Sequence, residues 1–180
     1  MSVCGYVSTK YGIVYGTDSQ LTPKGLFLKP YKKYKQLSDG SVILGVGEVA
    51  AWRKLCIELE KHNCDLDEID YKNLLPSTLD GSVECILIKP DCSVWSIDGP
   101  HGIYELTNNG YFFIGSGGES ALGAMYAYVQ GLETKNVTLK QAEEFLVSSL
   151  KASCVLDEFC NEPLFIGTIQ AVAKTSKRPR

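Results

Sequence analysis

Histidine is almost absent from this sequence: only His62 and His101 occur in 180 residues. A Ser-His-Asp triad or a histidine-rich zinc site therefore has little material from which to be built. His62 falls at the end of a predicted helix, where an imidazole can interact favourably with the helix dipole. His101 lies in a loop with Gly99, Pro100 and Gly102. If the chain is an enzyme, we expect its chemistry to proceed without histidine.

The sequence also lacks long apolar runs, a basic field and closely paired cysteines. No apolar segment approaches the roughly 20 residues that span a bilayer, and a net charge of −3 leaves no basic surface for nucleic acid. The seven cysteines are scattered, without CxxC spacing, which favours reduced and mostly buried thiols in a cytoplasmic protein. We expect no secretory signal, because the first residues form a strand-like pattern.

What is present indicates one globular domain. The hydrophobic fraction of 44% is ordinary for a soluble protein, and 180 residues can bury a proper core. No internal repeat or low-complexity linker divides the chain. The basic residues at the C-terminal end form the only basic cluster. We therefore predict one domain over residues 1–173 and a solvated tail over 174–180.

The apolar patterning predicts an α+β fold. Two short strands are expected within residues 2–19, and further strands at 31–37, 42–46, 83–88, 93–97, 111–114 and 164–172. Helices are expected after Gly47, near 67–74, after Gly118 and from the capping box that begins at Thr138. Because the helices come in consecutive pairs, two sheets between helix layers would satisfy this order.

Three of these helices have a predicted buried face. The spacing i, i+3, i+4, i+7 predicts the apolar residues that point inward. For the helix after Gly47 these are Trp52, Leu55, Cys56 and Leu59; for the helix after Gly118 they are Leu122, Met125, Tyr126 and Val129; for the helix after Thr138 they are Ala142, Phe145, Leu146 and Leu150.

The first strand begins at Ser2, which becomes the chain terminus once Met1 is removed. A terminal serine combines a nucleophile and a base, because its hydroxyl attacks while the free α-amine, with a pKa of roughly 7.7–8.0, takes the proton. Asp18 follows the second strand and Lys33 lies on a nearby one. A lysine there would stabilise the alkoxide and keep the amine neutral, and the aspartate would orient the lysine. Each residue alone also has an ordinary structural interpretation.

A glycine-rich step, Gly115-Ser116-Gly117-Gly118, separates a predicted strand from a predicted helix. Helix N-termini bind anions, so a phosphate site is one interpretation. The step lacks a Gly-Lys-Ser/Thr ending and a surrounding βαβ unit. Glycines that allow a tight turn or the close approach of another segment are the better interpretation.

Taken in order, these segments resemble the proteasome β subunits and the related bacterial peptidase HslV, which are N-terminal-nucleophile hydrolases. The resemblance covers nearly the whole chain and implies a four-layer αββα sandwich of two mainly antiparallel sheets. The segments that carry it are Gly16-Thr17-Asp18-Ser19, Tyr31-Lys32-Lys33, Val42 to Gly47, Phe113 to Gly118, and the helix that leads from Thr138 towards Asp157.

The resemblance also implies roles for individual residues. Ser2 stands at the position of the family's nucleophilic threonine, Asp18 and Lys33 stand beside it, and the Gly47 amide would be the oxyanion donor. Ser116 and Asp157 would orient the terminal amine. Gly45 and Val49 would line a roomy, apolar pocket for the substrate residue before the scissile bond.

This sequence departs from the family's pattern at several positions. Serine replaces threonine, which removes the methyl group that fixes the rotamer. Cys160 occupies a position where proteasome β subunits have serine, and Glu48 and Val49 stand where glycine and alanine are usual. A competing match places Ala152, rather than Asp157, at the late aspartate.

The predicted function is peptide-bond hydrolysis by Ser2 through an acyl-enzyme, without metal or organic cofactor. The resemblance implies a cytoplasmic, homo-oligomeric and stacked ring, supplied with substrate by an AAA+ unfoldase. One alternative is a non-catalytic, ring-forming scaffold of the same fold, as expected if Met1 is retained. Another is a related amidase that acts on a small amide with an open site in a monomer or dimer.

Overall fold

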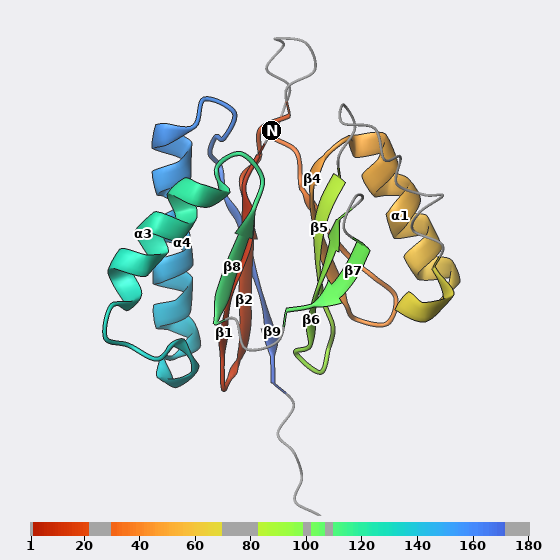
Figure 1. Cartoon of the computed structure of the whole chain (residues 1–180), viewed down its shortest axis with the longest axis horizontal. Helices are drawn as coiled ribbons and strands as arrows, with labels where there is room; N and C mark the ends of the chain where they lie inside the picture. Colours follow the sequence, from red (N-terminus) through yellow and green to blue (C-terminus); the bar gives the residue numbers. More distant parts are fainter. Residues whose placement is uncertain (1, 22–29, 70–82, 99–101, 107–109, 172–180) are drawn as a thin grey trace, which may run out of the picture.

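The computed structural model describes residues 2–21, 30–69, 83–98, 102–106 and 110–171 of the chain. These residues form two antiparallel sheets that face each other, with helices on their outer faces (Figure 1). Helices α3 (Gly118–Val129) and α4 (Leu139–Leu156) cover one sheet, and α1 (Val49–Lys61) covers the other. The predicted α+β sandwich is confirmed.

The first sheet has the strand order β8-β1-β2-β9 and is built around the N-terminal hairpin. Its strands are β1 (Cys4–Thr9), β2 (Gly12–Thr17), β8 (Tyr111–Ile114) and β9 (Phe165–Gln170). The two hairpin strands pair from Cys4 opposite Thr17 to Thr9 opposite Gly12. The residues that flank this hairpin, Ser2 and Asp18, therefore lie at the same end of the sheet.

The second sheet runs in chain order, β3-β4-β5-β6-β7. Its strands are β3 (Tyr34–Gln36), β4 (Val42–Gly47), β5 (Val83–Ile88), β6 (Val94–Asp98) and β7 (Gly102–Glu105). The strand predicted over 31–37 is shorter than expected, and Lys33 lies just before it. Strand β7 was not predicted, because four residues are too few to show an alternation.

The helices confirm the predicted starts but not every predicted buried face. Helix α1 buries Trp52, Leu55, Cys56 and Leu59 as expected, and α4 begins with the capping box of Thr138 and Gln141. The prediction for α3 was wrong at Leu122 and Tyr126, which are 46% and 61% exposed. This helix packs through Gly118, Ala121, Met125 and Val129, because a small alanine lets it approach its neighbours closely. Phe145 of α4 is only partly buried.

Three apolar clusters hold the layers together. One lies under α1, one lies under α3 and α4, and the third lies between the sheets around Tyr6, Leu44 and Ile86. Because β1 packs on β4 across this third cluster, the start of the chain reaches the end of β4.

Some expectations fall outside the described residues. These are Met1, His101, most of the helix expected near 67–74 and the tail over 174–180; only the single 3₁₀ turn Leu66–Glu68 is described near 67–74. Within the described ranges, no helix has the length and apolar character needed to cross a membrane.

Candidate active site

The glycine-rich turn Gly115–Gly118 holds the backbone of Ser2. The carbonyl oxygen of Ser2 accepts a hydrogen bond from the Gly117 N–H at 3.2 Å. Gly115 has φ +91°, and a Cβ there would lie 2.2 Å from the same carbonyl oxygen. Only glycine fits this position without strain. The glycines of the turn therefore allow the Ser2 backbone to approach closely, as the sequence predicted.

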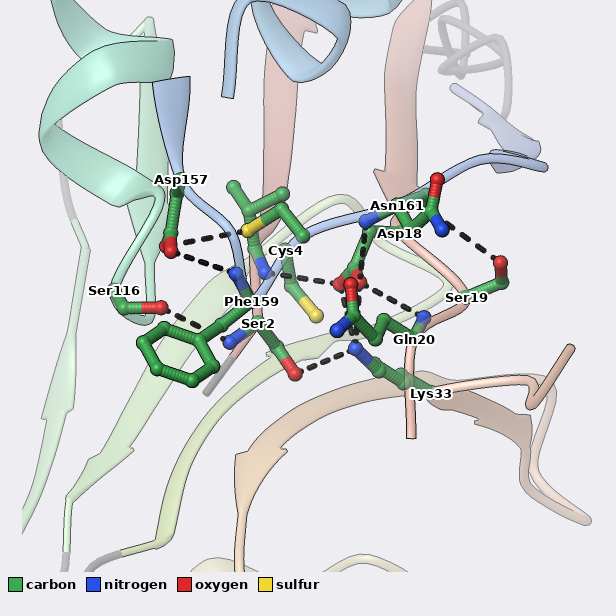
Figure 2. Close-up of polar contacts among 12 residues, drawn as sticks. Ser2, Cys4, Asp18, Ser19, Gln20, Lys33, Ser116, Asp157, Phe159 and Asn161 are labelled. Atoms are coloured by element: carbon green, nitrogen blue, oxygen red, sulfur yellow. Dashed lines mark hydrogen bonds and ion pairs between the residues drawn. The ribbon is translucent and has the colours of Figure 1, made fainter. Parts of the chain in front are cut away.

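The side chains of Ser2, Asp18 and Lys33 meet in a buried cluster (Figure 2). The Lys33 ammonium donates to Ser2 Oγ at 2.5 Å and to the two Asp18 carboxylate oxygens at 2.7 and 2.8 Å. Ser2 and Lys33 are each 5% exposed, and Asp18 is fully buried. A carboxylate can be buried at this depth because charge-assisted hydrogen bonds replace its hydration.

The backbone on both sides of Asp18 supplies the remaining donors. The N–H groups of Val3 and Gln20 each donate to its carboxylate at 2.9 Å, and the Asn161 N–H approaches at 3.4 Å. Val3 is placed by the β1–β2 register, since the Asp18 N–H also donates to the Val3 carbonyl oxygen. The carboxylate is therefore fixed in position as well as paired.

Lys33 reaches this cluster from the other sheet. Its carbonyl oxygen accepts from the Gly45 N–H at 2.9 Å, which extends the pairing of β3 with β4 by one residue. The hydroxyl and the carboxylate thus come from the first sheet and the cation from the second. Their meeting depends on how the two sheets stack.

On the opposite side of Ser2, polar side chains lie between its nitrogen and the end of α4. The Ser2 N–H donates to Ser116 Oγ at 3.2 Å, and the Ser116 hydroxyl is near enough to Asp157 to lower the pKa of its carboxyl. Asp157 also accepts from the Phe159 N–H at 2.9 Å and from the Cys160 thiol at 3.4 Å. Figure 2 shows Ser116 joined to the Ser2 nitrogen, with Asp157 on the same side of Ser2. In the chain that still has Met1, this nitrogen is a peptide N–H that stands where the free amine would lie.

These contacts keep Asp157 ionised. Partial burial raises its pKa, but the nearby Ser116 hydroxyl and the hydrogen bonds from the Phe159 N–H and Cys160 outweigh burial, so that the pKa lies below its ordinary value. The alternative position, Ala152, lies inside α4 and has no polar side chain. The structure thus brings Asp157, and not Ala152, to Ser116.

A cavity of about 360 Å³ opens beside Ser2 and Lys33. The predicted residues Gly45, Gly47 and Val49 line it, and Gly47 has φ +96° at the end of β4. Its other walls are chiefly Tyr31 and Trp52, whose rings meet edge to face at 6.3 Å. We call this space the aromatic cavity.

The aromatic cavity is narrower at Gly45 than the sequence predicted. A Cβ at Gly45 would lie 2.2 Å from Trp52 Cδ1, so the indole occupies the space that the missing side chain leaves. The helical pattern identified Trp52 only as a core residue. Trp52 therefore packs directly on Gly45, and its indole forms part of the cavity wall near Ser2.

The sequence analysis did not identify two residues whose backbone N–H groups contact the Asp18 carboxylate. Gln20 lies two residues after Asp18, and an aspartate that accepts from the N–H two residues later is a common local turn that could have been recognised. Asn161 lies 143 residues from Asp18, and no local signal connects them.

Cys4, Cys154 and Cys160 lie near the cluster, and their thiols are not activated as nucleophiles. Burial raises the pKa of the Cys154 thiol to about 11. Burial also raises the pKa of Cys4 and of Cys160 well above the ordinary value, and the carboxylate of Asp18 acts in the same direction. All three are therefore protonated thiols at neutral pH, and the thiolate is the reactive form.

No protein-family model matches the sequence, and no curated protein matches it. Among solved structures, the fold is similar to eukaryotic HslV from Trypanosoma brucei at 20% identity, with a TM-score of 0.71, covering 93% of this chain and 99% of that one. It is similar to Anbu (ancestral beta-subunit) from Yersinia bercovieri at 15% identity, with a TM-score of 0.73, covering 93% and 82%. It is also similar to Thiobacillus denitrificans BPH, a bacterial proteasome homologue, in complex with epoxomicin, at 16% identity, with a TM-score of 0.66, covering 94% and 99%.

Proposed function

We propose that this chain, which has the fold of the proteasome β subunits and HslV, hydrolyses peptide bonds with Ser2 as its nucleophile. The observation that carries the proposal is the buried contact of one lysine with both the Ser2 hydroxyl and the Asp18 carboxylate. A lysine that was only structural would need its counter-ion but no serine hydroxyl. The proposal requires the removal of Met1, which frees the Ser2 amine.

In the first half of the reaction, Ser2 Oγ attacks the scissile carbonyl carbon and its proton passes to the free amine of the same residue. Lys33, which is ion-paired with Asp18, stabilises the alkoxide as the bond forms. The carbonyl oxygen becomes an oxyanion that accepts from the Gly47 N–H, a contact of a kind that supplies about 3–4 kcal/mol of transition-state stabilisation. The C–N bond then breaks, and the Ser2 ammonium returns the proton to the leaving nitrogen.

In the second half, water attacks the Ser2 ester and the amine again takes the proton. Breaking the ester bond releases the acid and restores Ser2. Ser116, which contacts the Ser2 nitrogen, and the nearby Asp157 orient the amine for both steps. An amine held in one position is a more effective base, because its lone pair already faces the proton that it accepts.

The lining of the aromatic cavity indicates which substrate side chain it would bind. Its walls of Tyr31, Val49 and Trp52 favour an apolar side chain in the residue before the scissile bond. One protein of similar structure, Thiobacillus denitrificans BPH, is in complex with epoxomicin, which supports a ligand-binding site in this fold. We further propose a stacked homo-oligomeric ring in the cytoplasm, with an AAA+ unfoldase that supplies unfolded chains.

Intact mass, measured before and after treatment with an epoxyketone peptide, tests the proposal. Such a reagent forms two bonds to one residue, one to the hydroxyl and one to the free terminal amine. We expect a starting mass without methionine and one adduct per chain, which Ser2→Ala abolishes. The matched control Ser19→Ala, at a buried serine after the same hairpin, should keep the adduct.

Retention of Met1 would lead to an alternative function. With Met1 in place, the Ser2 nitrogen is a peptide N–H that donates to Ser116 Oγ and cannot act as the base. A chain that retains methionine and forms no adduct would be a non-catalytic scaffold, and the proposal would then be wrong.

A further inference from the structure

Two serines lie on the face of α4 that packs against the first sheet. Ser149 and Ser153 are both fully buried and stand one helical turn apart, on the same face as Leu146 and Leu150. A buried hydroxyl needs a hydrogen-bond partner, and a helical serine commonly uses the carbonyl oxygen four residues earlier. The Ser149 hydroxyl does so, because it donates to the Phe145 carbonyl oxygen at 2.9 Å.

Ser153 makes a different contact. Its hydroxyl lies 3.5 Å from the Ser149 carbonyl oxygen, but only 2.7 Å from the carbonyl oxygen of Gly117 in the turn before α3. A hydroxyl has one proton to donate, and the shorter bond is the stronger one. The Gly117 carbonyl oxygen also accepts from the Ala121 N–H at 3.0 Å, so it would be satisfied without Ser153. The hydroxyl of Ser153 therefore binds α4 to the turn beyond what α3 itself requires.

Gly117 connects this contact to Ser2. Its N–H donates to the Ser2 carbonyl oxygen at 3.2 Å, while its own carbonyl oxygen accepts from Ser153. A Cβ at Gly117 would lie 2.9 Å from Ser153 Cβ and 2.7 Å from Cys160 Sγ, so a glycine here lets α4 come within hydrogen-bond distance of the turn. The preceding residue, Ser116, accepts from the Ser2 N–H. A shift of Gly117 would therefore disturb both backbone contacts of Ser2.

The end of α4 that Ser153 anchors also carries other groups of the site. The Asp157 N–H donates to the Ser153 carbonyl oxygen at 2.8 Å, which places Asp157 one helical turn further along. Beyond the helix, the Asn161 N–H approaches the Asp18 carboxylate. Ser153 thus lies where the segment that supplies these groups meets the turn that holds Ser2. A hydrogen bond between the two fixes their separation.

We propose that Ser153 is a positioning residue of the active site. By binding the Gly117 carbonyl oxygen, it holds the turn, and with it the Ser2 amine, at a fixed distance from Asp157. This inference rests on the proposed function. Ser153 acts through Gly117 rather than on the substrate. The effect on the rate arises because an amine accepts the proton efficiently only when its lone pair already faces the hydroxyl, and small displacements of reacting groups are costly.

A comparison of Ser153→Ala with Ser149→Ala tests the proposal. Each substitution removes one hydroxyl from a fully buried serine of α4 and keeps the Cβ, so the two should lower the urea midpoint by similar amounts. The rate constant of the epoxyketone adduct, followed by intact mass, should fall about tenfold in Ser153→Ala, because Ser2 is displaced by a fraction of an ångström. It should be unchanged in Ser149→Ala, whose hydroxyl binds only its own helix.

The pH dependence of kcat/KM for a peptide aminocoumarin separates positioning from a loss of folded protein. Its rise with pH reports the pKa of the free amine. A nearby carboxylate raises the pKa of an amine, so a greater distance to Asp157 should move this rise to lower pH in Ser153→Ala. Lys33 and Asp18 face Ser2 from the other side and are kept in both variants. A smaller folded fraction would lower the rate equally at every pH and leave the midpoint unchanged.

Amide hydrogen exchange tests the same link without requiring activity. The Gly117 N–H is protected by the Ser2 carbonyl oxygen. Peptides that contain residues 115–118 should therefore exchange faster in Ser153→Ala than in Ser149→Ala or the wild type.

The combined results distinguish this inference from the proposed function. If the wild type forms the adduct but the two variants react, titrate and exchange alike, the role of Ser153 is wrong and the proposed function stands. If the wild type forms no adduct, the proposed function is wrong and exchange decides. Faster exchange in Ser153→Ala alone would then support its hold on the Ser2 segment, and equal exchange in both variants would contradict it.

Discussion

At the residue scale, the Lys33–Asp18 pair dominates both the stability and the chemistry of the site. Two buried charges are favourable only while each satisfies the other, because neither is hydrated. Asp18 has backbone donors as well, but these are dipoles and do not replace a cation. Removing the lysine alone therefore leaves a buried negative charge.

Lys33→Met should lower the free energy of unfolding by about 3–5 kcal/mol, the range for removing one partner of a buried ion pair. Urea unfolding at pH 7 measures this change, and the epoxyketone adduct should be lost. Lys35→Met is the control, since Lys35 is 42% exposed and its ion pair with Glu60 is screened by water. Equal effects of the two substitutions would show that burial of the pair is not what stabilises it.

The thiols give a second prediction at this scale. Burial raises the pKa of Cys56 and of Cys154 to about 11. Because the native state then holds protons that the unfolded state releases above pH 9, these groups stabilise the fold below pH 9 and lose that effect as the pH rises towards 11. The urea midpoint should fall over the same range.

Reaction with a thiol reagent such as DTNB provides the direct measurement. At pH 8 a thiol with a pKa near 11 is about one thousandth thiolate, so the native protein should react slowly and faster with each pH unit. In guanidinium all seven cysteines should react at once. Rapid labelling of the native protein at pH 8 would refute the assignment of buried, protonated thiols.

At the scale of elements, the turn between β8 and α3 connects the fold to Ser2, the proposed nucleophile. Gly115 has a left-handed backbone conformation and touches the Ser2 carbonyl oxygen. The turn also carries Ser116, which accepts from the Ser2 N–H. A change in this turn should therefore affect catalysis more than it affects the sheet.

Gly115→Ala should reduce the rate of adduct formation about 100-fold or more, because a displacement of Ser2 by an ångström costs roughly that factor. The matched control is Gly123→Ala in α3, where a Cβ meets nothing within 4 Å. It should stabilise the protein by about 1 kcal/mol, the helix-propensity difference, and leave the adduct rate unchanged. Near-wild-type rates in Gly115→Ala would show that the turn does not position Ser2.

At the scale of the whole molecule, the proposed ring predicts a particle much larger than one chain. Closed cyclic symmetry satisfies every interface, so one assembly size should dominate. Light scattering or native mass spectrometry should give a mass that is a high multiple of 19.8 kDa. A monomer or dimer that still hydrolyses small amides would instead favour the amidase alternative.

The sequence by itself determined the elements and the composition of the central cluster. Strands β5 and β8 have the predicted bounds, and the buried face of α1 is the predicted one. Ser2, Asp18 and Lys33 were identified together because a terminal hydroxyl, a carboxylate and a lysine complete one chemistry, and the family resemblance placed them in order. Periods of 2 and 3.6 and short motifs are local properties, so they can be recognised without coordinates.

Only the tertiary structure decided which surfaces face each other. Leu122 and Tyr126 continue the apolar pattern of α3, but its packing buries Ala121 instead. Trp52 packs on Gly45, and the Asn161 N–H contacts the Asp18 carboxylate. Each contact joins segments that are far apart in the sequence. Such contacts depend on how sheets and helices stack, and the sequence of one element does not contain the position of its neighbour.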